Sequence, residues 1–230
     1  MTELILNSAY FGAVLSVGAF LLGRALQKRV KHPLCNPLLI AIVLVILFLL
    51  VFDLDYESYQ RSARYLSYFL TPATVCLAIP LYEQFELLKK NLRAVLAGIG
   101  SGVLASLCSV LALSLLFRLD HASYVTFLPK SITTAIGMGV SEELGGYVSI
   151  TVAVIIISGI LGNMFAESAC RLFRITEPIA RGVAIGSASH AIGTARAMEL
   201  GPVEGAMSSL SIVVSGLLTV AGAAVFANFL

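Results

Sequence analysis

A histidine and an arginine stand inside an otherwise apolar stretch near the C-terminal end, "GSASHAIGTARAMELG" (residues 186–201). A charge in such a setting is costly, so it faces a cavity or a partner. Arg196 offers a planar, two-pronged donor set that suits a carboxylate, and His190 could bind the same solute or carry a proton. Other roles stay open. Arg196 could pair with Glu199 or extend to water at the interface, and His190 could be a hydrogen-bonded packing residue.

The same phrase occurs earlier in the chain as "KSITTAIGMGVSEELG" (residues 130–145). The two copies share residues at the aligned pairs 131/187, 135/191, 136/192, 137/193, 143/199, 144/200 and 145/201. Hydroxyl groups gather in both copies, and they could replace water around a small polar solute: Ser131, Thr133, Thr134, Ser187, Ser189 and Thr194. Small residues are also what close helix packing in lipid requires, so each hydroxyl is a candidate for packing as well as for binding.

Carboxylates follow in both copies, at Glu143 and Glu199. They could carry a proton, form an ion pair or cap the returning segment, and we favour caps. Lys130 directly follows Pro129; it could lend positive potential to an outer vestibule, but an ordinary interfacial lysine is the favoured interpretation there. The sequence contains no catalytic motif, and its four cysteines lack metal-ligand spacing. We therefore expect no enzyme activity, no cofactor and no metal site.

The composition identifies the solvent that surrounds these residues. Of 230 residues, 58% are hydrophobic and 12% are charged, against about 25% charged in a typical soluble domain. Too little polar surface remains to cover a soluble globule of this size. The formal net charge of +2 does not suggest a nucleic-acid partner. The chain is predicted to be an integral membrane protein in contact with the lipid bilayer.

Six apolar segments are long enough, or nearly so, to cross a membrane. They are Leu4–Gly23, Pro37–Phe52, Tyr65–Gln84, Ala94–Phe117, Tyr147–Phe165 and Ala206–Phe226. The third is interrupted by Pro72 and Pro80, which free backbone carbonyls that line a cavity or find other donors. Thr74, between the two prolines, belongs to this broken part of the third span.

Positive charge marks the cytoplasmic side of each span. The densest basic loops are 24–32, 89–93 and 171–181, and placing all three inside puts both chain ends outside. The two phrases then become re-entrant hairpins near 129–146 and 183–202, which enter from opposite faces as an inverted repeat. Gly137 and Gly193 are the predicted tips. The predicted fold is all-α, with about six transmembrane helices plus these two hairpins, in a single domain over 1–230. Residues 1–127 supply N-terminal spans, and 128–230 form the repeat-containing core.

Several segments resemble the LrgB/CidB family of bacterial membrane proteins. They are "NPLLIAI" (36–42), "TPATVCLAIPLYEQ" (71–84), "LPKSITTAIGMGV" (128–140), "RGVAIGSASHAIGTARAMELG" (181–201) and "EGAMSSLSIVVSGLL" (204–218). One departure is Ala135, where members of the family often have proline after the paired threonines. The resemblance implies the bacterial plasma membrane and a small LrgA/CidA-type membrane partner. It also implies two activities: holin/antiholin-like control of murein hydrolases and lysis, or transport of small carboxylates, as in the related plastid glycolate/glycerate translocators.

The carboxylate substrates fit the independent interpretation of Arg196 and the hydroxyl groups. We therefore predict a secondary transporter of small monocarboxylates (pyruvate, lactate, glycolate or glycerate), driven by a proton or ion gradient and assembled as a homo-oligomer, with a dimer expected. The alternatives are a holin-like pore or lysis regulator, and a structural subunit whose transport activity resides in its partner.

Overall fold

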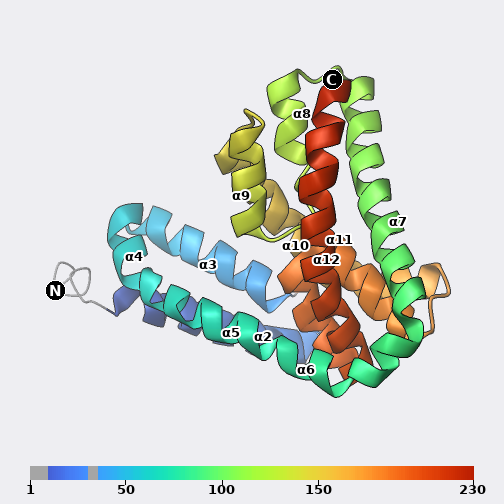
Figure 1. The fold of residues 1–230 in the computed structure, drawn as a ribbon. Coiled ribbons are helices and arrows are strands. Elements are labelled where there is room, and N and C mark those ends of the chain that lie inside the picture. Colours follow the sequence, from blue (N-terminus) through green and yellow to red (C-terminus); the bar gives the residue numbers. More distant parts are fainter. Residues whose placement is uncertain (1–9, 31–35) are drawn as a thin grey trace. The chain divides into compact units, whose positions relative to one another are not determined.

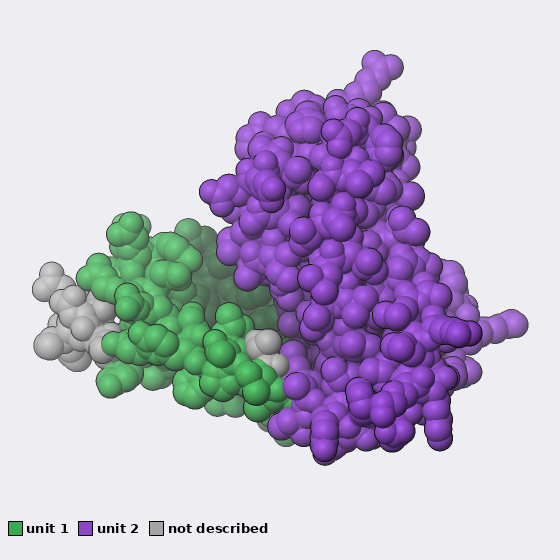
Figure 2. Space-filling model, in the orientation of Figure 1, with its two compact units in different colours: residues 1–76 green, residues 77–230 purple. Residues whose placement is uncertain are grey.

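The computed structural model describes residues 10–30 and 36–230, with every side chain in those ranges except that of Thr74. Over these residues the chain is helical and contains no strand (Figure 1), as the sequence predicts. It forms two compact units that divide between Cys76 and Leu77 (Figure 2). Part of the first predicted span, Leu4–Gly23, lies outside the described residues.

The first unit contains α2 (Phe11–Val30), α3 (Pro37–Val51), α4 (Tyr56–Ala63), the 3-10 helix η1 (Arg64–Phe69) and α5 (Leu70–Cys76). Asn36 begins α3, because its side-chain oxygen accepts hydrogen bonds from the Leu38 and Leu39 amides (2.9 and 3.2 Å). Glycine allows α2 and α3 to approach closely. A Cβ atom at Gly23 would lie 2.7 Å from the carbonyl oxygen of Pro37.

In the third predicted span a turn at Leu77 separates α5 from α6 (Ala78–Glu83). Pro72 lies in the first turn of α5 and Pro80 in the first turn of α6. Amide groups in a first turn have no partner within the helix, so proline is tolerated there. The side chain of Thr74 lies outside the described part of the structure.

The second unit continues with α7 (Phe85–Phe117), α8 (His121–Phe127), α9 (Thr134–Glu143), α10 (Val148–Leu172), α11 (Pro178–Leu200), α12 (Pro202–Phe226) and η2 (Ala227–Phe229). Helix α12, red in Figure 1, packs against both α7 and α11. Gly182 and Gly186 bring α11 very close to α12. A Cβ atom at Gly182 would lie 2.5 Å from the carbonyl oxygen of Glu204, and one at Gly186 would lie 2.4 Å from that of Ser208.

Three hydroxyl-bearing residues join α8, α9 and α10. The Thr151 hydroxyl lies within hydrogen-bonding distance of the Thr126 carbonyl (3.0 Å) and the Ser141 hydroxyl (2.7 Å), and the Tyr147 amide donates to Thr126 Oγ1 (2.8 Å). Because these groups are buried, separation of the helices would remove hydrogen bonds that water could not readily replace. The network therefore fixes the segment around the first repeated phrase.

Four helical segments within the described residues are long and apolar enough to cross a membrane, and Pro37–Val51 is a shorter apolar helix. The four are Tyr56–Glu83, Phe85–Phe117, Val148–Leu172 and Pro202–Phe229. Many of their large apolar side chains are exposed, among them Leu104, Ile157 and Leu217. Such an apolar exterior suits lipid and not water.

Candidate functional site

Both repeated phrases are broken, and the two breaks fall at nearly the same aligned position. In the first phrase Thr133 is extended (φ −64°, ψ 146°) and α9 begins at Thr134. In the second, His190, which aligns with Thr134, leaves the helical conformation inside α11 (φ 42°, ψ −140°). Gly137 and Gly193, which the sequence predicts as the tips of hairpins, lie in helix three or four residues after these breaks.

The two glycines are needed for space. A Cβ atom at Gly137 would lie 2.4 Å from the Ile155 Cδ1 atom, and one at Gly193 would lie 2.4 Å from the Ser189 Cβ atom. Both are closer than carbon atoms can approach. The glycines therefore permit tight packing beside each break and do not form the bend.

Ile155 of α10, which is fully buried, touches both phrases. Its side chain contacts Gly137, and its carbonyl oxygen accepts a hydrogen bond from Nε2 of His190 (3.0 Å). A carbonyl cannot donate, so Nε2 carries the hydrogen atom. Gly159 admits the ring, because a Cβ atom there would lie 2.8 Å from Nε2. In this structure the His190 side chain therefore holds the interrupted part of α11 against α10. This is the hydrogen-bonded packing role that the sequence left open.

The remaining polar groups around the second break satisfy its backbone. Thr194 donates to the His190 carbonyl (2.9 Å) and pairs with the Ser208 hydroxyl of α12 (2.7 Å). Asn163 donates to the Ile192 carbonyl (2.7 Å). Ser189 is buried against Gly162. These contacts hold an interrupted helix in an apolar interior, where free backbone groups are costly.

Arg196 forms ion pairs with Glu199 and with Glu167 of α10. Glu167 in turn pairs with Arg171 (3.5 Å). The guanidinium group is thus held by two carboxylates and does not line the cavity described below. Of the roles left open by the sequence, these contacts match the internal ion pair. Glu143, the aligned partner of Glu199, is exposed at the end of α9.

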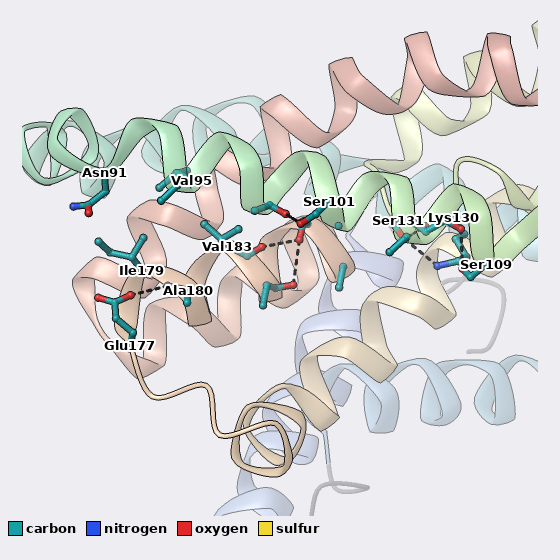
Figure 3. A pocket seen from close by; sticks show the side chains of 18 residues that line it. Asn91, Val95, Ser101, Ser109, Lys130, Ser131, Glu177, Ile179, Ala180 and Val183 are labelled. Atoms are coloured by element: carbon teal, nitrogen blue, oxygen red, sulfur yellow. Dashed lines mark hydrogen bonds between the residues drawn. The ribbon is translucent and has the colours of Figure 1, made fainter.

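A cavity of about 1010 Å³ runs between α7 and the first half of α11 (Figure 3). It exists because small residues of α7 face α11. Gly98 lies opposite Val183, and Gly102 lies opposite Ser187. Its lining residues are Asn91, Ala94, Val95, Gly98, Ser101, Gly102, Ala105, Ser106, Ser109, Lys130, Ser131, Glu177, Ile179, Ala180, Val183, Ala184, Ser187 and Ala188.

Ser131 and Ser187, which are aligned in the two phrases, both line this cavity. The Ser131 hydroxyl lies 3.2 Å from that of Ser106, and Ser187 contacts Gly102. Residues 102 and 106 are one turn apart on α7, about 6 Å along its axis. The two phrases therefore converge on one face of α7. Ser187 donates to the Val183 carbonyl (2.7 Å), which leaves its oxygen able to accept.

The charges of the cavity lie at its two ends. Lys130 and Glu177 stand far apart in Figure 3: Lys130 lies close to Ser109, and Glu177 lies toward Asn91. Residues 91 and 109 of α7 are separated by about 27 Å of helix. Glu177 is exposed and caps α11, where it accepts from the Ala180 amide (2.9 Å). Lys130 is half-buried and donates to the Ser131 hydroxyl (3.1 Å).

Two of the predicted binding residues, Ser131 and Ser187, thus line the cavity. Six do not: Thr133, Thr134, Ser189, His190, Thr194 and Arg196. Sequence reasoning missed the contribution of α7 and placed Lys130 at the interface. The signal that could have indicated this face of α7 is the run of small residues at helical spacing within an apolar span, "AGIGSGVLASLCS" (97–109).

Comparison with known proteins identifies the chain at family level. We found no match among solved structures. The model of the LrgB-like family matches residues 16–229, which is nearly the whole chain and includes both repeated phrases. The apolar spanning helices agree with this match. The chain is a membrane protein and belongs to the LrgB-like family.

Proposed function

We propose that this protein is a secondary transporter of small monocarboxylates of the pyruvate, lactate, glycolate or glycerate type. The observation that carries the proposal is the convergence of Ser131 and Ser187 on one cavity that also contains Lys130. Substrate sites of secondary transporters characteristically lie where two interrupted helices from related repeats approach one another. Family membership supports a protein that acts in the membrane.

The chemistry of the cavity end at Lys130 suits one carboxylate. The Lys130 amine supplies positive charge, and the hydroxyls of Ser106, Ser131 and Ser187 can exchange hydrogen bonds with a polar solute. Lys130 takes the role that the sequence gave to Arg196, because two carboxylates of the protein already engage Arg196. Apolar walls such as Val95 and Val183 suit the short carbon skeleton of the solute.

In this proposal the two phrases form an inverted repeat in the bacterial plasma membrane, with both chain ends outside. Access alternates as the segments that carry the two breaks move against the other spans. A small LrgA/CidA-type protein is the proposed partner, and the transporter itself is a homo-oligomer.

Direct flux tests the proposal. The purified chain is reconstituted in liposomes, and uptake of labelled glycolate and pyruvate is measured for wild type, Lys130→Met and Lys89→Met. We expect saturable uptake that Lys130→Met abolishes. Lys89→Met is the matched control, because Lys89 is exposed and pairs with Glu86 (3.0 Å) outside the cavity.

Three other results would contradict the proposal. Leakage of unrelated solutes such as sucrose indicates the holin-like alternative. If Lys130→Met and Lys89→Met both leave uptake intact, the substrate does not bind in this cavity. Absence of uptake, even after a small LrgA/CidA-type partner is added, excludes transport of these solutes.

A further inference from the structure

Lys130 occupies an unusual position for a lysine. It lies in the turn between α8 and α9, outside the four spanning helices, and its side chain is half-buried in the cavity wall. Its amine donates to Ser131, whose hydroxyl lies 3.2 Å from that of Ser106. Among the residues that the structure describes, no carboxylate forms an ion pair with it.

The elements around Lys130 offer little negative charge. Glu177, the other charged residue that lines the cavity, lies at the opposite end. Helix α9 carries Glu142 and Glu143 at its far end, about 12–15 Å of helix beyond Thr134. Helix α8 carries the exposed Asp120 at its N-terminal cap, the exposed His121 and the buried Tyr124, whose hydroxyl donates to the Phe226 carbonyl (2.9 Å). Helix α7 adds Cys108, which is exposed, and α11 presents Ser187.

An ammonium group without a counter-ion is unfavourable where water is partly excluded. Burial lowers the pKa of the Lys130 amine below the ordinary lysine value. A carboxylate that enters the cavity supplies the missing negative charge and raises the proton affinity of the amine again. Binding of the anion and binding of a proton therefore favour each other at this site.

The hydroxyl pair can serve both protonation states. When the amine is neutral, the Ser131 hydroxyl donates to the nitrogen lone pair. When it is charged, the nitrogen donates to Ser131, whose hydrogen turns toward the Ser106 oxygen. The distances of 3.1 and 3.2 Å permit both directions without movement of the backbone.

We propose that Lys130 is the proton site of the transporter: its amine releases a proton more readily when the cavity is empty than when a carboxylate is bound, so that carboxylate and proton bind together. The balanced step joins R–COO⁻, H⁺ from solution and the Lys130 amine into a carboxylate–ammonium pair. The inference rests on the proposed function and specifies its coupling ion. Substrate and proton then cross the membrane together, without net charge.

Proton uptake on binding tests this step. Binding of sodium glycolate to the purified full-length protein in detergent is measured by calorimetry in buffers of different ionisation enthalpy. Across a pH series from about pH 7 to about pH 10, we expect proton uptake per glycolate that increases as the free amine loses its proton, toward a limit of one. The Kd should rise by up to about tenfold for each pH unit.

Lys130→Arg is the decisive variant, because a guanidinium group keeps its charge throughout this range. We expect it to bind glycolate with no proton uptake and with a Kd independent of pH. In liposomes it should equilibrate glycolate but should not accumulate it in response to a pH gradient. Lys89→Arg, at an exposed position, should behave as wild type.

The outcomes separate the two proposals. Wild-type binding without proton uptake overturns the assignment of Lys130 but leaves carboxylate transport intact. Proton uptake that persists in Lys130→Arg overturns it as well, since another group must then titrate. If the wild type neither binds nor transports any of the four carboxylates, both proposals fail. The wild-type proton count decides the matter even where the arginine variant does not fold.

Discussion

Replacement of Gly186 by alanine tests the close contact between α12 and α11, the helix that lines the cavity with Val183 and Ser187. The new Cβ atom would lie 2.4 Å from the carbonyl oxygen and 2.7 Å from the Cα atom of Ser208. Both are backbone atoms of α12, so no side chain can rotate away to make room. Helices α11 and α12 must separate, and overpacking of this kind costs about 1–3 kcal/mol.

Gly100→Ala is the matched control. A Cβ atom there meets nothing within 4 Å, so the substitution changes the backbone of α7 without a clash. The intrinsic gain in helix propensity, about 1 kcal/mol, applies to both variants and cancels in their difference. We therefore expect Gly186→Ala to unfold about 2–12 °C below Gly100→Ala, from about 2–4 °C per kcal/mol for a chain of this length.

The structure also supplies a probe of unfolding. Cys170 is buried, with 4% of its surface exposed, so a thiol-reactive fluorophore reports when its helix opens. Cys35, Cys76 and Cys108 are first replaced by serine, because Cys76 and Cys108 are exposed and would react in the folded state. Equal melting temperatures for the two alanine variants would refute the reasoning, since the contact at Ser208 would then be absent or freely adjustable.

Two further predictions concern the site. Arg196→Gln should leave the KM for glycolate uptake nearly unchanged, because Arg196 pairs with Glu167 and Glu199 outside the cavity; a large rise in KM would restore it as the carboxylate clamp. In a chain without native cysteines, Ser109→Cys should react with a polar thiol reagent, and glycolate should protect it. Leu104→Cys in the same background should show no protection by glycolate, because Leu104 is exposed and does not line the cavity. Protection of both positions, or of neither, would place the solute elsewhere.

Local sequence patterns predicted the helices well. Hydropathy and length sufficed for Phe85–Phe117, Val148–Leu172 and Pro202–Phe226, since burial in lipid depends on consecutive apolar residues. The repeated phrase correctly indicated that both copies are interrupted. The exact place of the break could not be predicted, because the contact of His190 with the Ile155 carbonyl is made with another helix.

The candidate site was harder to predict for the same reason. The pair between Arg196 and Glu199 was visible at helical spacing, but Glu167 lies 29 residues away and meets Arg196 through packing of α10 on α11. Lys130 looked like an interfacial lysine because its exposure depends on the empty space beside α7. That space is created by small residues that sequence reasoning equally attributes to close packing.

The contacts of α7 recur with a regular interval. Gly98, Gly102 and Ser106 are spaced by four residues and meet Val183, Ser187 and Ser131 in turn. All three are no larger than serine, and Ala94 continues the series toward the start of the helix. Axial displacement of α7 by four residues, about 6 Å, in the direction that brings Ala94 to the place of Gly98 would set Gly98 and Gly102 in the next two places. Each small side chain on this face would then be replaced by another of similar size, and no larger side chain would meet Val183, Ser187 or Ser131.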